Sequence, residues 1–119
     1  MMHEQLNVRV DGDVHIVELH GQFIGGDETD AVRDTLIQLG HEAGSRIVVD
    51  LTGVSFVNSS FIGVLLGANA VAVRHRASIM LAGMQESVLE VITVTKMQLV
   101  FDLFDDVQQA LDSQRKQQS

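Results

Sequence analysis

One stretch of the chain, residues 47–70, limits its fold more than any other part. Residues 47–49, Ile-Val-Val, form an unbroken run of β-branched side chains, the pattern of a strand covered on both faces. Residues 50–53, Asp-Leu-Thr-Gly, are turn-forming types, and residues 54–57 fit a second short extended segment. We therefore predict a buried strand, a tight turn and another short strand.

A helix is predicted to follow these strands. Asn58, Ser59 and Ser60 carry side-chain oxygens that can accept hydrogen bonds from the free N–H groups of a helix's first turn. From Ile62 to about Val73 the chain is rich in Val, Leu and Ala and contains no charged residue. Most of the circumference of this helix must therefore be covered.

The amino-terminal part of the chain predicts a hairpin. Residues 6–10 alternate strictly between apolar and polar types, residues 14–19 nearly do so, and Asp-Gly-Asp at 11–13 lies between them. The glycine-containing residues 21–26 predict an irregular connection to the next element.

A first helix is predicted to begin in the acidic segment 27–30 and to end at Gly44. Its apolar stripe is formed by Val32, Leu36 and Leu39. Acidic side chains at a helix start cap free N–H groups and meet the positive end of the helix dipole. A metal site is the alternative interpretation of this segment. Capping is favoured, because four acidic or hydroxyl side chains in one helical turn point in different directions.

The carboxyl-terminal part continues the alternation of strands and helices. We predict a strand at 78–82, a helix at 86–94 with Val88, Val91 and Ile92 in the core, a strand at 99–101, a helix from Asp105 to about Gln114 with Val107, Ala110 and Leu111 inward, and a frayed tail over 113–119. This order predicts an α/β fold with one mixed sheet of four to five strands and about four helices packed against it. Residues 1–119 have room for a single domain, whose core spans about 6–112.

Charge and composition exclude some classes of partner and location. The formal net charge is −8, whereas a nucleic-acid surface needs clustered Lys and Arg, so we expect no direct nucleic-acid contact and a neutral or basic partner. The chain has no cysteine, residues 1–5 lack the pattern of a signal peptide, and the longest apolar run, 61–72, is too short to span a membrane. We expect a cytoplasmic monomer or weak dimer.

No catalytic arrangement is visible in the sequence. The histidines fall on different predicted elements without the i, i+4 spacing of a helical zinc site, and each is interpreted as a surface residue: His3, His15, His20, His41 and His75. Residues 21–26 resemble a phosphate loop only superficially, because no Gly-Lys-Ser/Thr follows. We therefore expect neither an enzyme nor a cofactor or metal site.

Residues 50–66, Asp-Leu-Thr-Gly-Val-Ser-Phe-Val-Asn-Ser-Ser-Phe-Ile-Gly-Val-Leu-Leu, resemble the signature of the STAS domain, in particular that of the anti-sigma factor antagonists. In that family an Asp-Ser-Ser-Gly or Asn-Ser-Thr-Gly element follows the central strand and opens a helix reading Leu-Gly-Val-Leu. The resemblance extends from about Leu6 to Leu111 and is strongest between Ile47 and Leu66.

The resemblance implies a small α/β domain whose first motif serine, here Ser59, is phosphorylated. The implied partner is both an anti-sigma factor and a serine protein kinase of the histidine-kinase-like ATPase type. Phosphorylation would release this partner and thereby switch a sigma factor or another client. The resemblance places the partner-binding surface on Asn58, Ser59, Ser60, Phe61, Phe23, Ile24 and Asp27.

Three positions depart from the family pattern. Phe61 replaces the usual glycine after the serine pair, so its ring either folds into the core or projects beside Ser59. Ile24 stands where the family has a loop acid, for which Asp27 or Glu28 is the substitute. Lys96 stands where a glycine often ends the third helix, which predicts a strained turn.

Two functions are therefore open. The first is the partner-switching antagonist. The alternative is a STAS scaffold that is not phosphorylated, or a small-ligand-binding module, within a regulatory or transport assembly, with Phe61 blocking access of a kinase.

Overall fold

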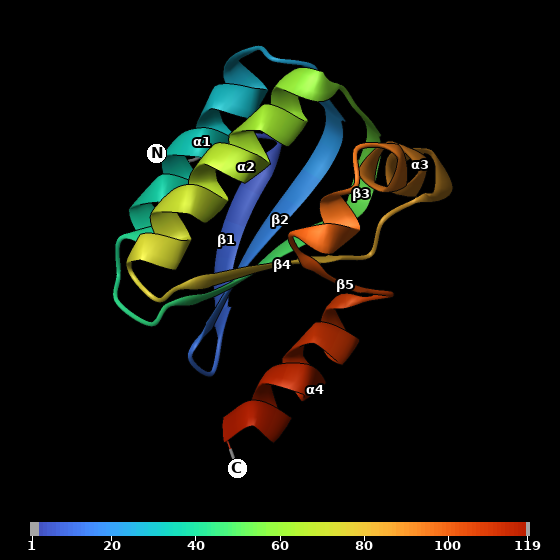
Figure 1. Ribbon diagram of the computed structural model, residues 1–119. Helices are drawn as coiled ribbons and strands as arrows, with labels where there is room; N and C mark the ends of the chain where they lie inside the picture. Colours follow the sequence, from blue (N-terminus) through green and yellow to red (C-terminus); the bar gives the residue numbers. More distant parts are fainter. Residues whose placement is uncertain (1–2, 119) are drawn as a thin grey trace.

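The computed structural model describes residues 3–118, which form a five-stranded mixed sheet with helices on both faces (Figure 1). The elements in chain order are β1 Leu6–Asp11, β2 Val14–Phe23, α1 Asp27–Gly40, β3 Arg46–Val57, α2 Ser59–Arg74, β4 Ser78–Ala82, α3 Glu86–Val94, the short 3-10 helix η1 Met97–Leu99, β5 Asp102–Phe104 and α4 Val107–Gln118. The predicted α/β architecture is confirmed. Within the described residues, no helix is both long and apolar enough to cross a membrane.

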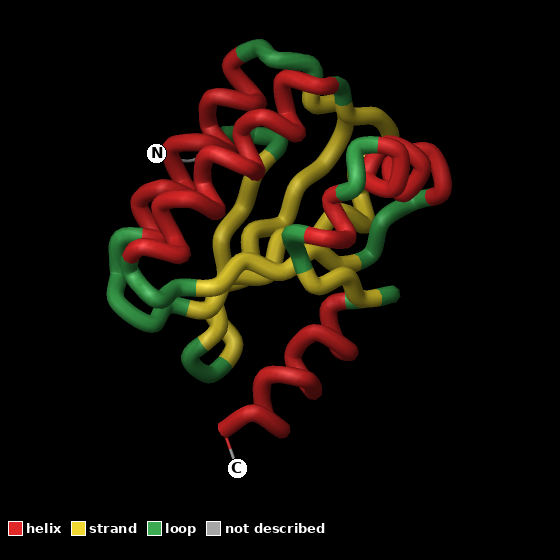
Figure 2. The backbone as a smooth tube through the Cα atoms, in the orientation of Figure 1, coloured by secondary structure: helices red, strands yellow, loops and turns green. Residues whose placement is uncertain are grey.

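The strands are arranged in the sheet in chain order, from β1 to β5. β1 and β2 form the predicted antiparallel hairpin, and Gly12 in its turn has a φ of +63°, which glycine adopts without steric cost. β2 to β5 are parallel to one another. Parallel neighbours require a crossover connection, which α1, α2 and α3 provide (Figure 2).

The central strands contribute side chains to two cores, one on each face of the sheet. Val17 and Val49 face the side covered by α1, α2 and α3, whereas Ile16 and Val48 face α4. Adjacent residues along a strand point to opposite faces, so β3 needs apolar side chains at consecutive positions. This confirms the predicted strand covered on both faces.

The turn predicted at residues 50–53 is wrong, because β3 continues from Arg46 to Val57. Its register against β2 shifts here, so that β3 contains an extra residue of the kind found in a β-bulge. Asp50 supports the bulge: its Oδ1 accepts hydrogen bonds from the N–H of Thr52 at 3.0 Å and from the Thr52 hydroxyl at 2.6 Å. The turn-forming residues therefore bend a strand without ending it.

The strand predicted at residues 99–101 is also wrong. Residues 97–99 form η1, and β5 begins only at Asp102. Lys96, which precedes η1, has a φ of +61°, in agreement with the strained turn predicted there. The turn directs Met97 and Phe101 into the core and leaves Leu99 78% exposed.

α4 is displaced toward the carboxyl terminus relative to the predicted helix over 105–114. Asp106 caps it by accepting a hydrogen bond from the N–H of Gln109 at 2.8 Å. Gln114, predicted to lie in a frayed tail, is buried, with its Nε2 2.9 Å from Sδ of Met80. The helix includes residues 113–118, and Ser119 lies outside the described residues.

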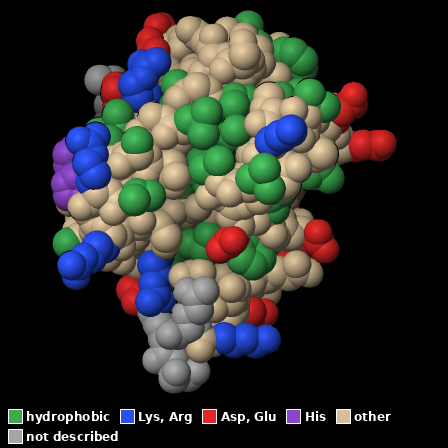
Figure 3. Space-filling model, viewed as in Figure 1, with side chains coloured by type: hydrophobic (Ala, Val, Ile, Leu, Met, Phe, Trp, Pro, Cys, Tyr) green, Lys and Arg blue, Asp and Glu red, His purple; other side chains and the backbone are tan. Residues whose placement is uncertain are grey.

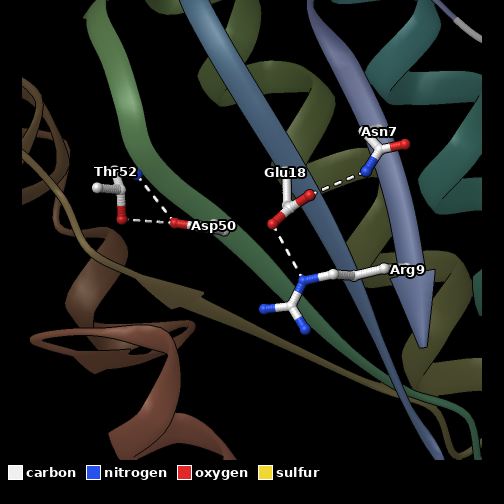
Figure 4. A network of polar contacts seen from close by, with 5 residues as sticks. All are labelled: Asn7, Arg9, Glu18, Asp50 and Thr52. Carbon is white, nitrogen blue, oxygen red and sulfur yellow. Dashed lines mark hydrogen bonds and ion pairs between the residues drawn. The ribbon is translucent and has the colours of Figure 1, made fainter. Parts of the chain in front are cut away.

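The face of the sheet on which α4 packs also carries polar side chains (Figure 4). Glu18 on β2 accepts hydrogen bonds from Nδ2 of Asn7 at 2.9 Å and from Nε of Arg9 at 3.0 Å, both on β1. These bonds, that of Asn7 first, hold the pKa of the Glu18 carboxyl below its ordinary value. Asp50 and Thr52 lie on the next strand along.

Candidate functional site

The start of α2 is held against the end of β2. The N–H of Asn58 donates to the carbonyl oxygen of Phe23 at 3.2 Å. The Asn58 side chain then accepts from the N–H groups of Ser60 at 3.0 Å and Phe61 at 3.3 Å. The predicted helix start is thus confirmed, and its cap is Asn58.

Ser59 is the first residue of α2 and is exposed to solvent. Within residues 3–118, its hydroxyl takes part in no hydrogen bond. Because Asn58 already caps the helix, the Ser59 oxygen is free to react or to bind. A phosphate on it would lie at the positive end of the helix dipole, where anions are stabilised.

Phe23 and Phe61 are both fully buried, so neither is a surface contact for a partner in this structure. Their ring centroids lie 5.4 Å apart with the planes tilted by 50°, a favourable aromatic arrangement. Of the two orientations open to Phe61, the inward one is observed. Phe23 and Phe61 were predicted to contact the partner, but both pack in the core. Burying the two rings removes a large apolar area from water.

The loop before α1 lies beside the start of α2 (Figure 2). Gly25 has a φ of +93°, and a Cβ placed on it would lie 3.1 Å from Oγ of Ser60. Ile24 in the same loop is 52% exposed. The structure therefore brings Ile24 and Ser60 to the same end of the molecule as Ser59.

Glu28 is the acidic side chain that shapes this loop. Its Oε2 accepts hydrogen bonds from the N–H groups of Ile24 and Gly26, each at 3.1 Å, and from the Thr29 hydroxyl. Burial raises the pKa of Glu28, but the bonds from Thr29, Ile24 and Gly26 outweigh this effect, so the pKa lies below its ordinary value. An ionised Glu28 thus fixes the loop that adjoins Ser60.

The acidic segment 27–30 does not cap α1 as predicted. The N-cap residue is Gly26, which has no side chain for the purpose, and the Glu28 carboxylate bonds to the loop instead. Asp27 lines a separate groove on α1, shared with His3 and Asp30. The predicted contact of Asp27 with the partner stays a prediction.

An exposed apolar stripe extends from Ser59 along α2. Leu66 and Val73, seven and fourteen residues after Ser59, are 41% and 64% exposed. Residues seven apart lie on the same face of a helix. Val73 borders a groove shared with Val100, and Figure 3 shows hydrophobic side chains gathered between α2 and α3. The spacing of seven is the sequence signal that would have revealed this surface.

A second groove lies between α1 and α2 and includes Ser60, Gly63 and Gly67. A Cβ on either glycine would meet nothing within 4 Å. Gly63 and Gly67 therefore do not pack against the domain's own sheet. They leave the α2 backbone open to solvent on the side next to Ser60.

Among residues 3–118, no group of three or more His, Cys, Asp or Glu side chains could hold a metal ion. His41 and His75 are nevertheless in contact, with Nδ1 of His41 3.3 Å from Nε2 of His75. Sequence spacing does not reveal this pair, because 34 residues separate its members.

Three solved structures resemble this fold closely. A proposed anti-sigma factor antagonist from Thermotoga maritima has a TM-score of 0.82 and 16% identity, over 94% of this chain and 96% of that one. The phosphorylated form of SpoIIAA from Bacillus has a TM-score of 0.70 and 15% identity, over 91% and 97%. A sulfate transporter family protein from Wolinella succinogenes has a TM-score of 0.71 and 16% identity, over 88% and 87%. At these identities the likeness shows the fold alone.

The family follows from a separate comparison of the sequence. No significant match was found among curated protein sequences. A model of the STAS domain, however, matches residues 5–110. The matched region contains all five strands and the helix that Asn58 opens. The chain therefore belongs to the STAS domain family.

Proposed function

We propose that this protein is an anti-sigma factor antagonist in a partner-switching pathway. Its partner is an anti-sigma factor that is also a serine kinase; the kinase phosphorylates Ser59, and this phosphorylation releases the kinase from the protein. The observation that carries the proposal is the exposed Ser59 hydroxyl, which has no hydrogen bond within residues 3–118. Asn58 provides the helix cap, so capping does not explain a serine at position 59. A kinase, in contrast, requires an accessible hydroxyl.

The stripe of Ser59, Leu66 and Val73 is the proposed contact with the unphosphorylated partner. α2 carries no charged side chain before Arg74, so the partner meets a neutral surface. A phosphate adds about −1.5 to −2 charges at pH 7, and burying such a charge against an apolar partner carries a desolvation penalty. A penalty of about 2.8 kcal/mol weakens a complex roughly a hundredfold.

The proposed partner is a serine protein kinase of the histidine-kinase-like ATPase type. In this proposal the protein acts in the cytoplasm by binding, without catalysing a reaction and without a cofactor, as a monomer or weak dimer. The net charge of −8 supports the absence of direct nucleic-acid contact.

The test is phosphorylation by a serine kinase of the histidine-kinase-like ATPase type. After incubation with the purified kinase and Mg-ATP, mass spectrometry should find a single phosphate, located on Ser59. Ser59→Ala should bind the kinase but stay bound when ATP is added. Ser60→Ala is the matched control, because Ser60 is also exposed and belongs to the same helix turn, and it should still be phosphorylated at Ser59. A stable kinase complex without phosphate on Ser59 would overturn the proposal.

A scaffold or small-ligand-binding role in a transport or regulatory assembly is the second candidate function. The likeness to the Wolinella succinogenes sulfate transporter family protein favours it. Under this function, ATP should leave every complex of the protein unchanged, and Ser59→Ala should behave as wild type in all of them.

A further inference from the structure

The carboxyl ends of α1 and α2 lie side by side, and a histidine follows each. Gly40, the last residue of α1, packs against Ala72 of α2, so closely that a Cβ on Gly40 would lie 3.5 Å from the Ala72 Cα. His41 caps α1 and His75 caps α2. Their ring centroids are 4.6 Å apart, with the planes inclined at 66°. Helix packing thus brings together two imidazoles that are distant in sequence.

The ring of His75 is oriented by its own helix. Its Nδ1 lies 2.9 Å from the carbonyl oxygen of Val71. A carbonyl can only accept, so Nδ1 carries the proton and Nε2 has a free lone pair, which faces Nδ1 of His41 at 3.3 Å. Metal-binding histidines are commonly held in this way, with one ring nitrogen donating to a backbone carbonyl and the other binding the ion.

We propose that His41 and His75 form a two-histidine site for a divalent transition metal ion of the Zn²⁺, Ni²⁺ or Cu²⁺ class. For Zn²⁺, tetrahedral metal–nitrogen bonds of about 2.0–2.1 Å place neighbouring ligand nitrogens roughly 3.3–3.4 Å apart, and the observed separation is 3.3 Å. Each ring turns by roughly 35° so that both lone pairs point to the ion. His41 moves its ring proton from Nδ1 to Nε2, so no proton is gained or lost.

The helix ends and the chemistry of the ligands favour a cation of this class, against the repulsion of Arg74 and Arg76, which flank His75. Each helix carboxyl terminus carries a partial negative charge of roughly half an elementary charge, and here two such ends meet. Imidazole nitrogens select zinc, nickel and copper over calcium and magnesium, which prefer oxygen. Because no group of three ligands exists among residues 3–118, water completes the coordination. His41 is exposed, so water reaches the ion.

This site is independent of the proposed function. α2 has 16 residues between Ser59 and Arg74, so His75 lies about 24 Å along the helix from the phosphoacceptor. A metal ion bound there joins the ends of α1 and α2 and stabilises the folded protein by mass action.

The test is calorimetric titration of the untagged full chain with ZnCl₂. Wild type should show saturable binding of one ion per chain. His41→Gln and His75→Gln should each weaken binding at least tenfold. The matched control is His20→Gln, which removes an exposed histidine from β2 and should bind as wild type does. Absence of saturable binding, or equal binding by all variants, would overturn the site.

Copper provides a second readout that needs no comparison of affinities. Electron paramagnetic resonance of the wild-type protein with one equivalent of Cu²⁺ should show coupling to two imidazole nitrogens. His75→Gln should show coupling to one. Coupling to two nitrogens in His75→Gln would mean that other histidines hold the ion, and the assignment would be wrong.

Discussion

At the scale of single residues, Asn58 and Ser59 have different roles although they are neighbours. Asn58 accepts two N–H hydrogen bonds at the start of α2, so Asn58→Ala should lower the free energy of unfolding by about 1 kcal/mol. Ser59→Ala removes no hydrogen bond within the described residues and should change it by less than about 0.5 kcal/mol. Urea denaturation measures both. A larger loss in Ser59→Ala would make Ser59 part of the cap.

Glu28 makes the loop beside Ser60 sensitive to acid. Its folded-state pKa lies below the ordinary value of 4.5, so its contribution to stability is complete above pH 4.5 and is lost as the pH falls through the folded-state pKa. Glu28→Gln should therefore be less stable than wild type at neutral pH, and the difference should shrink below the folded-state pKa.

Urea denaturation at pH 7 and in acid checks this expectation. Glu90→Gln, an exposed acid on α3, is the matched control and should change stability by less than about 0.5 kcal/mol at pH 7. A difference between wild type and Glu28→Gln that is the same at both pH values would contradict the role of the ionised carboxylate.

At the scale of elements, Phe61 anchors α2 to the sheet. Its ring is fully buried and packs on Phe23 at the end of β2. Phe61→Ala should therefore destabilise the fold by about 3–5 kcal/mol. Phe56→Ala, at a position 47% exposed, is the control and should cost much less. Equal denaturation midpoints for the two variants would show that Phe61 is not in the core.

The glycines of α2 have space for a side chain, whereas Gly83, which follows β4, does not. A Cβ on Gly63 meets nothing within 4 Å, so Gly63→Ala should stabilise the helix by about 0.5–1 kcal/mol. Gly83 has a φ of +77°, and a Cβ there would collide with the Thr52 hydroxyl, so Gly83→Ala should destabilise. Thermal unfolding distinguishes the two. A stability loss in Gly63→Ala would mean that the groove between α1 and α2 is closed.

Most elements could be predicted from the sequence because their hydrophobic period is strong. The predictions failed where a local signal had two structural outcomes. Asp50 and Thr52 are turn formers, yet their hydrogen bonds stabilise a bulge within β3. The apolar run 99–101 is divided by the end of η1 at Leu99, so that Leu99 lies in solvent and Phe101 lies in the core.

The candidate site was only partly predictable for a related reason. The position of Ser59 follows from the local motif at the start of α2. The burial of Phe23 and Phe61 depends on contacts between distant segments. The bonds of Glu28 are local, but an acid at a helix start has the same sequence signal whether it caps the helix or bonds to the preceding loop, as Glu28 does. A phenylalanine beside a motif serine has the same sequence signal whether its ring faces the core or a partner.

At the scale of the whole molecule, the proposed switch leaves the fold intact. The two cores lie on opposite faces of the sheet, and Ser59 lies at the surface at one end of α2. A phosphate there faces solvent and the positive helix end. Phosphorylation should therefore change the affinity for the partner while the free energy of unfolding stays nearly constant.

The most direct test compares two forms of the full-length protein, one with serine and one with phosphoserine at position 59. Their dissociation constants for the kinase and their thermal unfolding are measured together. We expect the phosphoserine form to bind at least a hundredfold more weakly, with Ser59→Asp also weakened, and to unfold at nearly the same temperature. Equal dissociation constants, or weaker binding accompanied by unfolding of the phosphorylated protein, would contradict a switch at the surface of α2.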